Sequence, residues 1–116
     1  MINRKNFLRL SLGLALTLVF AAGHSAEKPE FSKPRKSQLR HLLLQDCGSC
    51  HGMQLKGGLG PPLLPSALKQ QSVEAITSTI LYGRPGTAMP PWKGILSEAE
   101  ADWLARLLLQ GINGDE

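Results

Sequence analysis

The chain is poor in aromatic residues, cysteine and long apolar runs, and each shortage excludes a class of protein. Only 5% of the 116 residues are aromatic, and only two are cysteines. Two cysteines cannot form the multiple disulfides on which small secreted scaffolds depend. The apolar run at residues 10–22 has 13 residues, whereas a membrane-spanning helix needs about 20. A chain of this size must therefore complete its small core by another means.

Positive charge is concentrated near the N-terminus. The formal net charge is +4, and Arg4, Lys5 and Arg9 supply most of it, because residues 27–116 hold ten Lys and Arg against nine Asp and Glu. Basic residues followed by a short apolar run are typical of a secretory signal peptide. We expect residues 1–26 to be such a signal, cleaved between about 23 and 26 rather than kept as a membrane anchor. The nearly neutral remainder does not favour nucleic acid as a partner.

The two cysteines stand three residues apart and are followed directly by a histidine, in the order Cys47-Gly48-Ser49-Cys50-His51. This is the C-x-x-C-H pattern of covalent c-type haem attachment. On one helical turn both thiols face the same way, so each can form a thioether with one porphyrin vinyl group. His51 lies four residues after Cys47 on the same face and can bind the iron as proximal ligand. The motif predicts one covalently bound haem.

Three other interpretations of this motif are open. A thioredoxin-like dithiol requires a preceding strand, whereas residues 37–46 have the pattern of a leucine-rich helix. A structural zinc site needs a fourth ligand, and the other histidines, His24 and His41, are poorly placed to supply it. A plain disulfide suits an exported protein but leaves His51 unexplained.

The segments around the motif predict a small all-α wrapper of three to four helices around the haem. Residues 27–36 hold two prolines and six charges, which predicts a flexible spacer or, alternatively, a partner-docking arm. The domain is expected over residues 37–116, with a first helix running from Ser37 into the motif. Residues 52–65 hold too many glycines and prolines for a regular element. We expect this loop to pass the proximal side of the haem, with the carbonyl of Pro61 accepting from His51, although it could be only a turn.

Two further helices have clear start and stop signals. Ser72 is a candidate N-cap for a helix that Gly83 ends. The sequence from Ser97 to Glu100 has the form of a capping box, and Gly111 ends the helix that it opens. A short helix is expected near residues 66–69. No segment alternates as a strand would.

Met89 is the candidate for the sixth iron ligand, because it follows His51 by 38 residues and stands before two prolines. Met53 and His41 are close to His51 in sequence and are held on its side of the porphyrin, and Met1 lies in the predicted signal. Prolines restrict the backbone and keep the loop from becoming helical, which suits a fixed thioether ligand. The alternative is an ordinary buried methionine.

Two residues near Met89 are candidates for the haem pocket. Arg84 could pair with a haem propionate, or it could be a solvated loop charge. Trp92 is expected to pack against the haem edge rather than to relay electrons.

The order of these motifs resembles that of class I monohaem cytochromes c over nearly all of residues 37–111. Three stretches, at residues 55–61, 83–87 and 89–92, read LKGGLGP, GRPGT and MPPW. They are similar to the small periplasmic cytochrome c of the 55X type, associated with the haem-d1 nitrite reductase of denitrifying bacteria. The resemblance implies a periplasmic electron carrier in denitrification that delivers electrons to nitrite reductase. It equally allows an accessory subunit or electron acceptor in haem-d1 maturation.

The residues themselves agree with a carrier. With His51 and Met89 both on the iron, no coordination position is open for a substrate, so the expected chemistry is one-electron transfer. We find no catalytic constellation elsewhere and expect a monomer that is not an enzyme. Its partners should be redox proteins that form small, transient encounters at an exposed haem edge.

Overall fold

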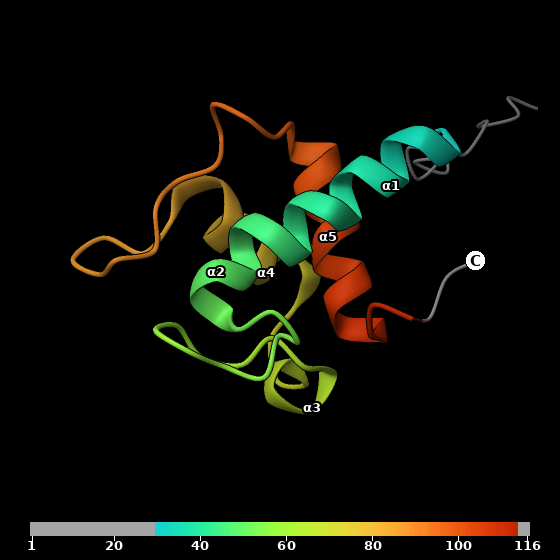
Figure 1. Cartoon of the computed structure of the whole chain (residues 1–116). Helices are drawn as coiled ribbons and strands as arrows, with labels where there is room; N and C mark the ends of the chain where they lie inside the picture. Colours follow the sequence, from blue (N-terminus) through green and yellow to red (C-terminus); the bar gives the residue numbers. More distant parts are fainter. Residues whose placement is uncertain (1–29, 114–116) are drawn as a thin grey trace, which may run out of the picture.

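The computed structural model describes residues 30–113. The predicted signal peptide lies outside this part of the chain. The described residues form an all-α fold without strands, built from the following elements (Figure 1): α1 (Lys33–Leu42), the π-helical turn η1 (Leu43–Cys47), α2 (Gly48–His51), α3 (Pro65–Leu68), α4 (Val73–Tyr82) and α5 (Glu98–Gln110). Since α1, η1 and α2 follow one another without a break, the fold has four helical segments, as predicted. No helix within residues 30–113 has the length and apolar character to cross a membrane.

The first helix begins earlier than the sequence analysis expected. Residues 33–36, assigned to the flexible spacer, form the first turn of α1, so the spacer prediction and the domain boundary at Ser37 are corrected there. The start signals are Ser32, whose side chain accepts a hydrogen bond from the Arg35 amide, and Pro34 in the first turn. Proline suits this place because its missing N–H would have no helical partner anyway.

A single π-helical turn, η1, connects α1 to the cysteine motif. The Gly48 amide donates to the carbonyl of Leu43, five residues back, instead of the four of an α-helix. The chain therefore holds one extra residue between the leucine face of α1 and Cys47. Such turns are rare and are frequently found at functional sites.

Helices α4 and α5 form where the capping signals predict them. The Ser72 hydroxyl accepts from the Ala75 amide at 3.1 Å, and α4 ends before Gly83, which has a φ of +67°. At the start of α5, Ser97 and Glu100 make both hydrogen bonds of the capping box. The short helix α3 lies within one residue of its predicted place.

The core lies between α5 and the other helices. Helix α5 packs against α4, α3 and α1, with Leu104, Leu107 and Leu108 buried. Leu39 and Leu43 from the first helical segment join the same cluster. The aliphatic cluster brings the C-terminal helix against the segment that carries the cysteines, and it thereby fixes the base of the candidate site.

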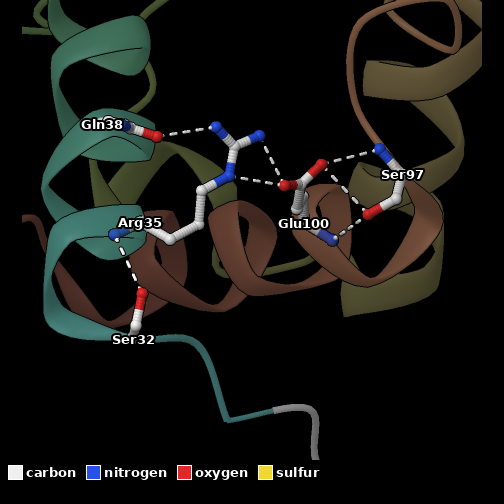
Figure 2. Close-up of polar contacts among 5 residues, drawn as sticks. All are labelled: Ser32, Arg35, Gln38, Ser97 and Glu100. Atoms are coloured by element: carbon white, nitrogen blue, oxygen red, sulfur yellow. Dashed lines mark hydrogen bonds and ion pairs between the residues drawn. The ribbon is translucent and has the colours of Figure 1, made fainter.

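An ion pair ties α1 to the start of α5 (Figure 2). The guanidinium of Arg35 donates from Nε to the Glu100 carboxylate at 2.7 Å and pairs with it through Nη2 at 2.5 Å. The other oxygen of Glu100 accepts from the amide and the hydroxyl of Ser97 at 2.9 and 3.0 Å. Only 13% of the Glu100 side chain is exposed. One carboxylate thus caps α5 and joins it to α1.

Aromatic and cationic contacts also join the first described residues and α1 to α5 and the residues after it. The Phe31 and Trp103 rings meet edge to face, with centroids 6.5 Å apart. The guanidinium of Arg40 lies 5.7 Å from the centroid of the Trp103 ring and donates to the carbonyl of Ile112. Residues near both ends of the described chain are therefore held on α1 and α5.

Candidate haem site

The cysteines and histidine of the motif lie at the end of the first helical segment. Cys47 is half-buried, Cys50 is exposed and His51 is buried, with 9% of its surface exposed. The two cysteines form no disulfide with each other. The motif thus presents two thiols that can be alkylated and one sheltered imidazole from a single turn and a half of helix.

The Cys47 thiol is held in its neutral form. Burial, together with the negative charge of Asp46, raises its pKa to about 11. Reactive dithiols of the thioredoxin kind work through a thiolate whose pKa is lowered instead. The electrostatics of Cys47 thus oppose the dithiol interpretation.

The loop after His51 folds back onto the motif and bonds to its carbonyls. The Gly60 amide donates to the Cys50 carbonyl, and the Gly57 amide donates to the His51 carbonyl, each at 2.8 Å. These carbonyls lie at the end of α2, where helical partners are missing. The glycine-rich stretch is therefore a defined wrapping of the motif, as the sequence predicts, and not only a turn.

The imidazole of His51 is oriented by a backbone carbonyl. Its Nδ1 lies 2.7 Å from the carbonyl oxygen of Pro61. A carbonyl can only accept, so Nδ1 is the donor, and Nε2 is the ring nitrogen left to bind a metal. Metal-bound histidines are held by this type of outer hydrogen bond. The predicted contact between Pro61 and His51 is confirmed.

The backbone of Gly60 also contacts the His51 ring, and the sequence analysis missed this contact. A Cβ at Gly60 would lie 2.7 Å from Cε1 and 2.8 Å from Nδ1 of His51. The ring therefore rests directly on the Gly60 backbone. Only the adjacency of Gly60 to Pro61 in the sequence hinted at this role.

Met89 lies in the long loop between α4 and α5, which extends away from the helices (Figure 1). Its side chain is half-buried, and its amide donates to the hydroxyl of Thr87 at 3.3 Å. That hydroxyl donates in turn to the carbonyl of Arg84 at 2.7 Å. The loop is therefore ordered by its own hydrogen bonds.

The other two pocket candidates differ in their surroundings. Trp92 is half-buried against the core cluster, and its amide donates to the carbonyls of Ile80 and Leu81 at the end of α4. Arg84 is exposed, so the propionate and solvent interpretations of its charge both stay predictions.

Two of the residues rejected as sixth ligand lie on the surface, and the third, Met1, lies outside the described residues. Met53 is 55% exposed and His41 is exposed on α1. Within residues 30–113 no three His, Cys, Asp or Glu side chains group together as metal ligands, so the zinc interpretation has no ligand set there. A cavity of about 390 Å³ lies beside the end of α5, lined in part by Leu63 and Leu108, and it includes none of the candidate haem ligands.

The available donors fit a covalent c-type haem. Two thiols three residues apart can each add across a vinyl group, and the lone pair of His51 Nε2 suits iron. A disulfide would use the thiols but leave the oriented imidazole without a role, and a zinc ion would still lack a fourth ligand among residues 30–113.

Comparison with known proteins gives a consistent result. Residues 34–108 match the family model described as cytochrome c oxidase, cbb3-type, subunit III. The chain is 54% identical over 104 residues to cytochrome c55X of Pseudomonas aeruginosa, covering 87% of this chain and 86% of the relative.

Two further similarities concern a solved structure and an enzyme. The solved c-type cytochrome NirC aligns with a TM-score of 0.69 and 53% identity, covering 73% of this chain and all of that one. The dihydro-heme d1 dehydrogenase of Pseudomonas aeruginosa is 37% identical over 100 residues, which cover 85% of this chain and 18% of the enzyme.

Proposed function

Because the chain belongs to the cytochrome c55X family of monohaem c-type cytochromes, we propose that it is a periplasmic one-electron carrier whose haem is bound by His51 and Met89. The family makes it an electron-transfer protein with one covalently bound c-type haem, and not an enzyme. The ligand pair, the compartment and the redox partner are the parts that we propose. The partner is a haem-d1 nitrite reductase.

The hydrogen bond from His51 Nδ1 to the Pro61 carbonyl is the observation that carries this proposal. It leaves Nε2 as the only basic nitrogen of a buried ring, on the helix that also presents the two thiols. Cys47 and Cys50 would attach the haem as thioethers, and the bound haem would supply reversible one-electron chemistry. Met89 would occupy the opposite side, so that no position is open for substrate.

The remaining pocket residues have supporting roles in the proposal. Trp92 joins the core cluster and is hydrogen-bonded to α4, so its indole would form part of the apolar wall at the haem edge. The exposed Arg84 would pair with a propionate. A His/Met ligand set favours a comparatively high reduction potential.

The second candidate function is electron acceptance in haem-d1 maturation. The observation that favours it is the 37% identity to a segment of dihydro-heme d1 dehydrogenase. The matched segment is 18% of the enzyme, so a segment similar to this chain is built into a dehydrogenase. A separate cytochrome of the same kind could take electrons from such an enzyme.

Rapid mixing distinguishes the two functions. The reduced holoprotein is mixed with oxidised haem-d1 nitrite reductase, and the oxidised holoprotein is mixed with the dehydrogenase and its dihydro-haem substrate. We expect fast oxidation in the first experiment. No transfer to the reductase together with fast reduction by the dehydrogenase would favour the maturation role.

The ligand assignment needs a separate test. We expect Met89→Ala to lose the weak near-infrared absorption band that ferric haem shows with a methionine sulfur ligand, and to have a lower reduction potential. Met53→Ala is the matched control, because Met53 lies on the surface. An unchanged spectrum and potential in Met89→Ala would remove Met89 from the iron.

A further inference from the structure

Gly83 is the first residue of the loop at residues 83–97, between α4 and α5, that carries Met89 and is called the methionine loop below. The part of this loop just after Met89 comes back to lie against Gly83. Helix α4 ends at this residue, whose amide donates to the Thr79 carbonyl at 2.9 Å. Its φ of +67° and ψ of −165° belong to a region that is essentially restricted to glycine. The chain therefore leaves α4 in a direction that no other residue type readily adopts.

The returning part of the loop presses directly on Gly83. A Cβ there would lie 2.6 Å from the carbonyl oxygen of Met89, 2.8 Å from the carbonyl carbon of Pro90 and 2.9 Å from the nitrogen of Pro91. All three are backbone atoms. No side-chain rotation can make room for them, so a side chain at position 83 must displace the segment that holds Met89.

This segment has little freedom to move elsewhere. The Arg84 amide donates to the Met89 carbonyl at 3.2 Å, and the Trp92 and Lys93 amides donate to carbonyls at the end of α4 at 3.1 Å. Pro90 and Pro91 have fixed φ angles. The outgoing residues 83–84 and the returning residues 89–91 are thus in direct backbone contact, and we call this contact the neck of the loop. Gly83 is the residue at its centre.

We propose that Gly83 is the positioning residue for Met89, because its missing side chain allows the Met89 carbonyl to seat against the end of α4. The position of the Met89 backbone limits where its thioether can reach. This inference rests on the proposed ligand role of Met89. It assigns to Gly83 no contact with the haem itself.

The test compares Gly83→Ala with Gly86→Ala in the matured holoprotein. Gly86 lies in the same loop and also has a positive φ, of +78°, but a Cβ there meets nothing within 4 Å. We expect Gly83→Ala to lose the near-infrared band and to bind added imidazole at least tenfold more tightly, because a displaced Met89 no longer competes. Gly86→Ala should keep the band and bind imidazole as the unsubstituted protein does.

The outcomes separate this inference from the proposed function. If Met89→Ala keeps the band, the ligand assignment itself is wrong. If Met89→Ala loses the band and Gly83→Ala keeps it, the ligand stands and the positioning role is overturned. An equal loss in Gly83→Ala and Gly86→Ala also overturns the positioning role, because any strained glycine of the loop would then have the same effect.

A second pair of variants covers the case in which Gly83→Ala does not accumulate as holoprotein. Pro91→Ala frees the facing arm of the neck, whereas Pro85→Ala frees an exposed position in the same loop. Tighter imidazole binding in Pro91→Ala alone supports the inference. Equal binding in both variants contradicts it.

Discussion

Removing the Glu100 carboxylate should destabilise the protein more than any other single change at the start of α5. Its contacts with the Ser97 amide and hydroxyl and with Arg35 are all lost in Glu100→Ala. The capping interaction contributes about 1 kcal/mol, and the negative charge near the helix N-terminus contributes about 0.5 kcal/mol. The ion pair adds about 0.5 kcal/mol, because 39% of the Arg35 side chain is exposed to solvent. The expected loss is about 2 kcal/mol, or a fall of roughly 10 °C in Tm.

Urea unfolding of the ferric holoprotein, followed by far-ultraviolet circular dichroism, measures this loss. Glu98→Ala is the matched control, since Glu98 lies in the same first turn and makes no hydrogen bond or ion pair with the rest of residues 30–113. The control should cost about 0.5 kcal/mol, which is the interaction with the helix dipole alone. Equal losses in the two variants would refute the argument from the Glu100 contacts.

The pH dependence gives the same prediction a second test. Burial raises the pKa of Glu100, but the hydrogen bonds from Ser97 and Arg35 lower it more, so the folded-state pKa lies below its ordinary value. The charged form is therefore favoured in the folded protein. Its contribution is present above the ordinary pKa of a glutamate, about 4.3, and is lost as pH falls through the lower folded-state pKa. The stability difference between the unsubstituted protein and Glu100→Gln should accordingly shrink in acid.

Two smaller changes should act in opposite directions on the unfolding free energy of the holoprotein. Gly60→Ala places a methyl group 2.7 Å from the His51 ring and should lower the unfolding free energy by about 1–3 kcal/mol. The control is Gly94→Ala, whose methyl group meets nothing within 4 Å and should change the stability little. Similar losses in the two variants would contradict the close contact at Gly60. Thr77→Val should stabilise the protein by about 1 kcal/mol, because the buried Thr77 hydroxyl has no hydrogen-bond partner within residues 30–113. Chemical denaturation measures the change. A loss of stability would show that the hydroxyl is hydrogen-bonded in the holoprotein.

The sequence predicted a helix correctly where a capping residue and an apolar face indicate the same helix bounds. Ser72 and Gly83 bound α4, and the Ser97 capping box opens α5, as the sequence analysis expected. The start of α1 was missed because residues 27–36, which include its first turn, hold two prolines and six charges and so suggest a spacer. The Ser32 cap and the tertiary ion pair of Arg35 with Glu100 favour the helix instead, and a pair 65 residues apart leaves no trace in local sequence.

The candidate site was predictable where chemistry fixes the spacing. The C-x-x-C-H motif and the Pro61 carbonyl followed from the needs of thioether attachment and of an oriented imidazole. The roles of Gly60 and Gly83 could not be predicted in the same way. Each depends on a close approach between backbone and a distant or returning segment, which composition alone does not reveal.

The π-helical turn η1 rotates the side chains that follow it about the helix axis, relative to the side chains of α1. An α-helix advances by about 100° per residue, so the extra residue in Leu43–Cys47 offsets the cysteine motif from the leucine face of α1 by roughly that angle. The face of α1 that contacts α5 can therefore point in a different direction from Cys47, at the end of η1, and His51, on α2, without a break in the backbone. Transplanting C-x-x-C-H onto a regular helix with the leucine pattern of α1 would aim the motif at the wrong neighbour unless this one-residue offset went with it.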